Sequence, residues 1–182
     1  MMSMYREEEI ELQMINERLK SIYFTGPFVN MVGGKIYTIK ADGHCLFRAL
    51  SHQLSLYLPL EQPHIEVPTY ETLRKQCEAA ILSDKKKYVE FLCNPDGEPM
   101  TMDQVTQYAL SIGRCNDNPT WGSHTEISII SQIYDSPIVI IGSDFQLCVG
   151  QGQKNSHLYI TFHRKADGAS EHYNSVVPQQ MP

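Results

Sequence analysis

Residues 41–49 read ADGHCLFRA, and this stretch contains two structural signals in succession. The alternating side chains of residues 35–39 are typical of a strand, and the Asp42-Gly43 pair that follows them is typical of a tight turn. Beyond the turn, apolar residues recur at three- and four-residue steps from Leu46 to Leu54, which indicates a helix. The sequence therefore predicts a strand, a tight turn and a helix that begins at about Cys45.

Further helices and strands are expected on both sides of this turn. Helical spacing of apolar residues predicts helices over residues 4–22 and 70–92, and the helix after the turn should end at Leu58-Pro59. Thr101-x-x-Gln104 and Ser123-x-x-Glu126 match the spacing of capping boxes, so a helix should begin near each. Apolar or alternating runs predict strands at residues 35–39, 137–142, 158–162 and 173–177. This order of elements favours an α/β or α+β layer fold with helices covering a sheet.

The first predicted helix has an apolar stripe, with charged residues on its other faces. The stripe consists of Leu12, Ile15, Leu19 and Ile22. Two interpretations are open: the helix packs on the edge of the domain, or it binds a protein partner, including a short coiled coil. Glycine-containing breaks follow, and we divide the chain into an N-terminal helix with its connection, residues 1–28, and a main domain, residues 29–182. The lysine run at residues 85–87 is expected to be a solvated face or a break between helices.

Composition argues against several classes of protein. The 182 residues have a formal net charge of −6, whereas nucleic-acid binding favours a clustered basic surface. No stretch approaches the roughly 20 apolar residues that span a bilayer, and the opening residues lack the apolar core of a signal peptide, so no membrane role is expected. The five cysteines are odd in number and show no C-x-x-C spacing, which fits neither a disulfide framework nor a zinc module. We therefore expect reduced thiols, no metal or other cofactor, and a cytoplasmic or nuclear protein.

Cys45 has the position expected of a nucleophile. It lies three residues after Asp42, which is a favourable helix cap, and so in the first turn of the predicted helix. The unpaired amides and the positive end of the helix dipole should lower the pKa of the Cys45 thiol. The same amides could hold an oxyanion, and Gly43 would let the backbone approach a substrate closely. The alternative is that Cys45 has no catalytic role and is a small residue of the core.

His172 and Asn174 provide a candidate base and its orienting group. Alternate residues of a strand face the same side, so the Asn174 side chain can hydrogen-bond the His172 ring and select its tautomer. Together with Cys45 they would complete the arrangement of nucleophile, base and orienting group found in cysteine acyl-transfer enzymes. A single histidine on a strand is, however, more often a structural residue than a base.

Three motifs in a fixed order resemble those of the ovarian-tumour (OTU) superfamily of cysteine deubiquitinases. Residues 42–49 are similar to the Cys motif of this superfamily. Trp121-Gly122, with the following Glu126, is similar to its central Trp-Gly block. Residues 172–176 are similar to its closing His motif. The resemblance covers roughly residues 35–177. It implies a papain-like OTU fold with a mostly antiparallel or mixed central sheet flanked by helices, and residues 29–182 as the catalytic domain. It also implies hydrolysis of the isopeptide bond after the C-terminal Gly-Gly of ubiquitin, with ubiquitin or polyubiquitin as partner.

The same resemblance implies roles for individual residues. Cys45 matches the nucleophile, His172 the general base, and Asn174 the position of the Asp or Asn that orients the histidine. Asp42 matches an acidic residue counted with the active site, and either a catalytic or a structural role is open for it. We therefore take these four residues as the candidate catalytic group.

A second group is expected to bind substrate or to shape the oxyanion site. Gly43 and His44 would contribute loop backbone, with the His44 side chain directed away from the nucleophile. Trp121 and Gly122 would shape the cleft, and direct contact between Trp121 and the ubiquitin tail is the alternative. Two rival functions stay open: a catalytically inactive ubiquitin-binding module, and a protease for another ubiquitin-like modifier or a polyprotein.

Overall fold

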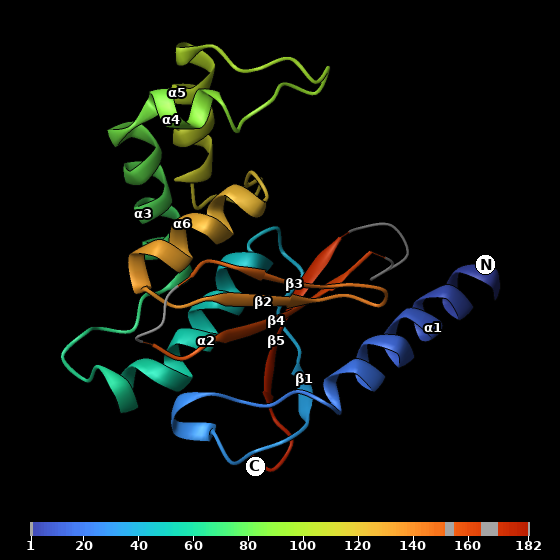
Figure 1. Cartoon of the computed structure of the whole chain (residues 1–182). Helices are drawn as coiled ribbons and strands as arrows, with labels where there is room; N and C mark the ends of the chain where they lie inside the picture. Colours follow the sequence, from blue (N-terminus) through green and yellow to red (C-terminus); the bar gives the residue numbers. More distant parts are fainter. Residues whose placement is uncertain (1, 152–154, 165–170, 182) are drawn as a thin grey trace.

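The computed structural model describes residues 2–151, 155–164 and 171–181, which form an α+β domain (Figure 1). The helices within these residues are α1 (Met2–Leu19), α2 (Cys45–Glu61), α3 (Tyr70–Ser83), α4 (Lys85–Val89), α5 (Met102–Ile112) and α6 (His124–Tyr134), with a short 3-10 helix at Gly26–Phe28. The strands are β1 (Gly34–Tyr37), β2 (Ile138–Ile141), β3 (Gln146–Val149), β4 (Leu158–His163) and β5 (His172–Pro178).

The five strands form one mixed sheet in the order β1-β5-β4-β2-β3. The β1/β5, β5/β4 and β2/β3 pairs are antiparallel, and the β2/β4 pair is parallel. The register between the first pair places Tyr37 opposite Ser175, so the end of β1, just before the predicted turn, lies beside β5. The mixed sheet with flanking helices confirms the predicted fold class.

Helix α2 is the central helix of the core and packs against β4 and β5. Its side chains Phe47, Leu50 and Leu54 are buried, as the apolar spacing predicts. Gln53 on the same helix is buried as well, and its side-chain amide donates to Val176 O on β5 at 2.6 Å and accepts from Tyr159 N on β4 at 2.7 Å. Because these bonds tie α2 to two strands, the start of α2 is held in place relative to β5.

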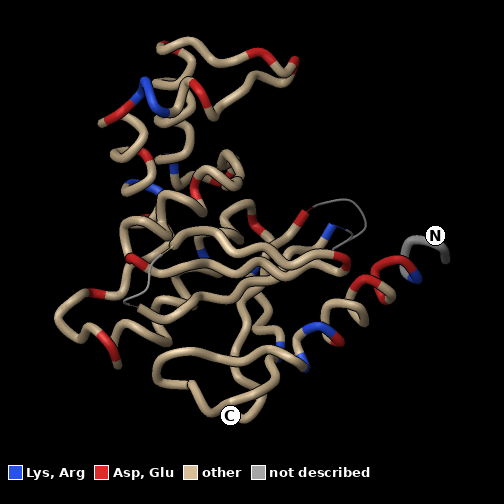
Figure 2. The backbone as a smooth tube through the Cα atoms, in the orientation of Figure 1, with Lys and Arg blue, Asp and Glu red and all other residues tan. Residues whose placement is uncertain are grey.

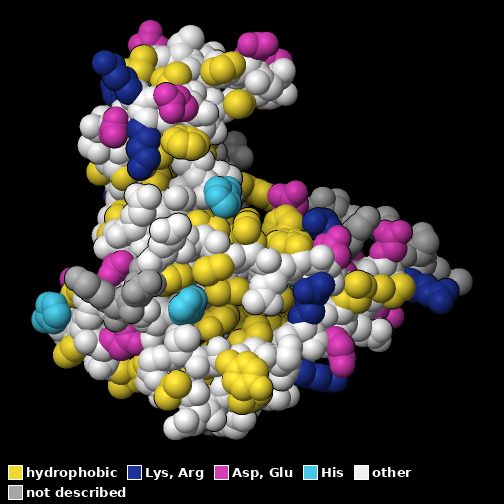
Figure 3. Space-filling model, in the orientation of Figure 1, with side chains coloured by type: hydrophobic (Ala, Val, Ile, Leu, Met, Phe, Trp, Pro, Cys, Tyr) yellow, Lys and Arg dark blue, Asp and Glu magenta, His cyan; other side chains and the backbone are white. Residues whose placement is uncertain are grey.

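Helices α3, α4 and α5 form a helical arm, residues 70–112, to one side of the sheet (Figure 1). Figure 3 shows a notch between this arm and the rest of the molecule, with hydrophobic side chains at its base. Both predicted capping boxes are present: Thr101 and Gln104 cap the start of α5, and Ser123 and Glu126 cap the start of α6. The single helix predicted over residues 70–92 is wrong: the chain breaks at Asp84, so the lysine run opens a separate helix.

The N-terminal helix packs on the domain through its second half. Ile15 and Leu19 are buried, as is Ile22 in the segment after the helix, which ends at Leu19 and not at residue 22 as predicted; α1 contacts β1, β2 and β4. Leu12 is 44% exposed, so the buried stripe begins later than the spacing predicts. Acidic residues are concentrated in the outer part of α1 (Figure 2).

Two further differences from the sequence-based expectation have local causes. Helix α2 continues past Pro59 to Glu61, because a proline removes only its own N–H, and Gln62 N still donates to Leu58 O at 2.8 Å. Strand β3 was not predicted, because it is a four-residue edge strand with three exposed residues and therefore has no buried periodicity. In the described residues, no helix is long and apolar enough to cross a bilayer.

Candidate active site

Cys45 is the first residue of α2 and is only 7% exposed. The turn before it requires a glycine, because Gly43 has a φ of +83° and a Cβ there would lie 2.7 Å from Pro119 Cγ. A hollow of about 200 Å³ opens beside the cysteine, lined by Gly43, Cys45, Leu46, Trp121, Gly122, Ser123, Glu171 and Tyr173. The structure thus brings the Cys motif, the Trp-Gly block and the start of β5 to one place.

The environment of Cys45 differs from the expectation in its electrostatics. Burial raises the pKa of the Cys45 thiol, and this effect outweighs the backbone N–H groups of Tyr173 and Leu46, which act in the opposite direction. The predicted lowering of the Cys45 pKa is therefore wrong for the free protein. The negative charge of Asp42 adds to the effect of burial.

His172 is held by Asn174, as the strand spacing predicts. Asn174 Oδ1 lies 2.9 Å from His172 Nε2 and also accepts the backbone N–H of Ile39 at 2.8 Å. A backbone N–H can only donate, which identifies this amide atom as the oxygen, so Nε2 of His172 must carry a proton. In the neutral ring, Nδ1 is then the nitrogen with a free lone pair.

Strand β5 brings the sulfur and the imidazole into one region without joining them. The Tyr173 N–H, which stabilises the Cys45 thiolate, directly follows His172 in the chain. The hydrogen bonds of the described residues do not include one between Cys45 Sγ and the His172 ring. His172 and Asn174 instead line a neighbouring hollow of about 750 Å³, together with residues of α1 and of the segment from Lys35 to Ala41.

Asp42 organises the loop before the cysteine. Its Oδ1 accepts the His44 N–H at 3.0 Å, and its Oδ2 lies 2.7 Å from Arg48 Nη2. Burial by itself would raise the pKa of Asp42, but Arg48 and the His44 N–H outweigh that effect and lower it. Asp42 is not the helix cap that the sequence predicts, because His44 occupies the cap position of α2.

His44 and the buried Arg74 attach this loop to the helical arm. Arg74 on α3 is completely buried and donates to His44 Nδ1 at 2.8 Å, to Gly43 O at 3.2 Å and to Ile112 O at 2.8 Å. His44 Nε2 must then donate to Asn116 O, at 3.1 Å. The His44 ring is therefore turned toward the arm, as expected, and burial lowers its pKa, with Arg74 acting in the same direction.

Arg74 is a residue that the sequence analysis missed. The signal was its spacing, since Arg74, Cys77 and Ile81 recur at three- and four-residue steps on α3 and all are buried. An arginine in an apolar stripe indicates a buried cation that needs several acceptors. Here those acceptors are the loop before Cys45 and the end of α5.

The Trp-Gly block forms the opposite side of the hollow beside Cys45. A Cβ on Gly122 would lie 2.6 Å from Leu46 Cδ2 and 2.9 Å from Phe47 Cε2, so this glycine allows the block to lie against α2. The buried Glu126 carboxylate accepts from Ser123 N at 2.8 Å and from Tyr108 Oη at 2.9 Å, which fixes the start of α6. Trp121 is 48% exposed and lines the hollow.

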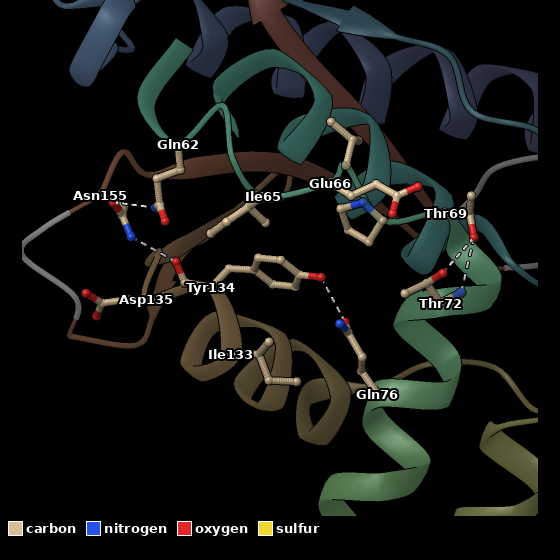
Figure 4. Close-up of a pocket in the computed structure, with 12 residues that line it drawn as sticks. Gln62, Ile65, Glu66, Thr69, Thr72, Gln76, Ile133, Tyr134, Asp135 and Asn155 are labelled. Carbon is tan, nitrogen blue, oxygen red and sulfur yellow. Dashed lines mark hydrogen bonds between the residues drawn. The ribbon is translucent and has the colours of Figure 1, made fainter. Parts of the chain in front are cut away.

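Another hollow, of about 710 Å³, lies away from these residues, between α3, α6 and the loop after α2 (Figure 4). Several of its polar side chains bond within the hollow: Tyr134 Oη donates to Gln76 Oε1 at 2.9 Å, and Gln62 donates to Asn155 at 2.9 Å. None of the sequence-predicted site residues lines it. Among the residues that the structure describes, no group of three His, Cys, Asp or Glu side chains is arranged to hold a metal ion.

Comparison with known proteins gives consistent matches. A family model described as "OTU-like cysteine protease" matches residues 40–173. Among curated proteins, the chain is 31% identical over 144 residues to "Deubiquitinase OTUD6B" of Xenopus laevis, and equally so to that of Homo sapiens, covering 78% of this chain and 46% of each relative. It is 25% identical over 142 residues to "Ubiquitin thioesterase otu2" of Schizosaccharomyces pombe, covering 76% of this chain and 44% of the relative. The chain thus spans less than half the length of these curated relatives.

Two solved structures are similar to this chain in fold, although their sequences are less than 20% identical to it. The OTUD1 OTU domain matches with a TM-score of 0.59 and 15% identity, covering 93% of this chain and 96% of that one. An OTU domain in complex with ubiquitin matches with a TM-score of 0.57 and 18% identity, covering 81% of this chain and 72% of that one.

Proposed function

The chain belongs to the family of OTU-like cysteine proteases, and on this premise we propose that it is a deubiquitinase that hydrolyses the isopeptide bond after the C-terminal glycine of ubiquitin. The observation that carries the proposal is the hydrogen bond from His172 Nε2 to Asn174 Oδ1. This bond leaves His172 Nδ1 free to act as a base. Tyr173, the next residue of β5, has its backbone N–H at the Cys45 sulfur. The names of the relatives, which describe deubiquitinases and a ubiquitin thioesterase, support ubiquitin as the substrate.

In the proposed reaction, His172 Nδ1 takes the proton of the Cys45 thiol when substrate occupies the site. Because burial raises the pKa of Cys45, this transfer is needed to form the nucleophile. The sulfur then attacks the carbonyl carbon of the terminal glycine. The His44 N–H is already bonded to Asp42, so the N–H groups of Gly43 and Cys45 are the proposed donors to the oxyanion.

Collapse of the tetrahedral intermediate breaks the bond to the lysine nitrogen, which leaves as an amine with the proton from His172. A water molecule then gives a proton to His172 and attacks the thioester. When the C–S bond breaks, His172 returns that proton to the Cys45 sulfur, and the released carboxylic acid of ubiquitin loses its proton to solvent. Asn174 keeps the imidazole in one tautomer throughout, and Asp42 acts through the conformation of the loop. These steps use side chains, the backbone N–H groups of the loop before Cys45, and water.

The hollow beside Cys45 supports a substrate whose residues next to the scissile bond are small. It measures about 200 Å³ and is bounded by Trp121 and by the Gly122 backbone. Two glycines fit such a space. Trp121 is therefore proposed to shape the cleft.

The partner is proposed to be ubiquitin or polyubiquitin and not nucleic acid or a membrane surface. The net charge of −6 supports this, and the longest run of basic residues is the three lysines that open α4 (Figure 2). The acidic outer part of α1 is a candidate surface for a further protein partner. A thiol nucleophile among unpaired cysteines supports a reducing compartment, the cytoplasm or the nucleus.

A second candidate function is an inactive ubiquitin-binding module. Two observations favour it: the raised pKa of Cys45 and the lack of a sulfur–imidazole hydrogen bond among the described residues. An electrophilic probe built on the C-terminus of ubiquitin distinguishes the two functions, because the enzyme forms one covalent adduct and the binding module forms none.

The proposed function is tested with a panel of di-ubiquitins of every linkage. The wild-type chain should cleave at least one of them, and Cys45→Ala and His172→Gln should cleave none. Cys115→Ala is the matched control, because Cys115 is a free, exposed cysteine outside the hollow beside Cys45. Cleavage by Cys45→Ala would contradict the nucleophile assignment, and probes built on other ubiquitin-like modifiers test the alternative substrate.

A further inference from the structure

A second buried histidine contacts the amide that holds His172. His163 is the last residue of β4, lies opposite His172 in the antiparallel register and is 6% exposed. Its Nε2 lies 3.2 Å from Asn174 Nδ2 and 2.8 Å from Thr161 Oγ1. His163 therefore belongs to the same hydrogen-bonded group as the proposed base.

The direction of each bond in this group follows from the Ile39 N–H. That N–H donates to Asn174 Oδ1, so the other amide atom of Asn174 is its nitrogen, which can only donate. A bond between them therefore requires His163 Nε2 to be the unprotonated acceptor, with the proton of the neutral ring on Nδ1. The Thr161 hydroxyl, 2.8 Å from the same nitrogen, then donates to it as well and shares its lone pair. Two groups thus fix the Asn174 amide: Ile39 holds its oxygen, and His163 holds its nitrogen.

The surroundings of His163 keep its ring neutral. Burial lowers its pKa to about 4, the charge on His172 acts in the same direction, and Glu11 on α1 opposes them. Glu11 and His172 are the titratable groups that face the ring from the packed elements, and Glu11 also accepts the Arg164 N–H at 3.0 Å. At neutral pH, Nε2 of His163 is available as an acceptor.

We propose that His163 is a positioning residue for the reaction: by accepting the Asn174 side-chain N–H, it directs the Asn174 oxygen to His172 Nε2 and so selects the tautomer in which Nδ1 is the base. The proposal rests on the proposed function for its catalytic consequence. Without an acceptor at this point, Asn174 has a buried donor with no partner, and the Ile39 N–H alone holds its amide, so the bond from His172 to Asn174 is weakened. His172 then samples both tautomers, and only one of them can take the Cys45 proton.

The activity test compares three substitutions of His163. Both His163→Leu and His163→Asn remove the acceptor. Leucine has no acceptor atom, and the asparagine amide is too short to reach the position of Nε2. His163→Gln places an amide oxygen near that position and should restore the bond. We expect kcat/KM on the cleaved di-ubiquitin to fall about 10- to 100-fold in the first two, chiefly through kcat, and to return to within about threefold in the third.

Two further readouts separate positioning from a general structural role. In the kcat/KM–pH profile of His163→Asn, the apparent pKa of the basic group should shift, because the tautomer with Nδ1 free is only partly populated. A variant that merely lowers the folded fraction keeps the wild-type apparent pKa. His157→Leu is the matched control: His157 is a partly buried histidine just before β4, at the opposite end from His163, and it should retain wild-type kcat/KM.

Nitrogen-15 NMR of the imidazole rings tests the proposal without any substrate. The wild-type chain should show His172 protonated at Nε2 and His163 unprotonated there, and His163→Asn should show His172 as a mixture of tautomers. A wild-type His172 tautomer in His163→Asn would overturn the proposal, whatever the activity. A wild-type chain that cleaves no ubiquitin but shows these NMR shifts would contradict only the proposed function.

Discussion

The pH dependence of stability gives a direct measurement of how strongly His163 is desolvated. Its pKa changes from 6.5, the ordinary value of histidine, to about 4 in the folded chain. Above about pH 6.5 the ring is neutral in the folded and the unfolded chain, so it adds no pH dependence. Between these two pH values the unfolded chain binds a proton that the folded chain does not, and the free energy of unfolding therefore falls as the pH falls.

The size of this effect follows from the two pKa values. Their difference, converted at about 1.4 kcal/mol per pH unit, corresponds to a loss of about 3 kcal/mol of stability between about pH 6.5 and about pH 4. Below about pH 4 both states are protonated, and no further loss arises from this ring. Protonation of Nε2 also converts the acceptor of the Asn174 bond into a donor, so the same transition breaks that bond.

The perturbation is His163→Gln, which retains an acceptor but does not titrate. Urea unfolding of this variant and of the wild-type chain, followed by circular dichroism, gives the difference in free energy of unfolding at several pH values. We expect the wild-type chain to lose about 3 kcal/mol relative to the variant as the pH falls from about 7 to about 4. His64→Gln, at an exposed position, controls for the exchange of histidine for glutamine in itself. A wild-type-minus-His163→Gln difference that is constant with pH would refute the reasoning, because the ring would then titrate alike in both states.

Three further predictions concern the cysteine and its supports. The rate of Cys45 alkylation by iodoacetamide is measured by mass spectrometry of the Cys45 peptide. This rate should reach half its maximum at a higher pH than for a free thiol, because burial raises the Cys45 pKa. A lower midpoint would contradict this. Arg74→Lys should lower the free energy of unfolding, measured in urea, by about 2–4 kcal/mol and should also reduce kcat. The reason is that one ammonium group cannot reach His44, Gly43 O and the α5 carbonyl together, and wild-type stability would contradict this. Gly122→Ala should cost about 1–3 kcal/mol by thermal unfolding, because the added methyl overlaps α2, and an unchanged Tm would show that the block can shift.

Short-range patterns were readable directly from the sequence. The Asp-Gly turn, the helix that starts at Cys45 and both capping boxes involve residues within four positions of one another, so their hydrogen bonds depend on local spacing. The bond between His172 and Asn174 is readable for the same reason, since strand geometry places alternate side chains on one face. The resemblance to a family then supplied the connection between segments far apart in the chain.

The sequence by itself determined the kind of fold and the candidate chemistry, namely a mixed sheet with flanking helices and a cysteine, a histidine and an asparagine in order along the chain. Only the tertiary structure decided the state of those groups. Burial raises the Cys45 pKa against the backbone N–H groups around the sulfur, Arg74 reaches the cysteine loop from α3, and His163 meets Asn174 across two strands. These properties depend on which distant residues exclude water and supply hydrogen-bond partners, and neither composition nor spacing along the chain specifies them.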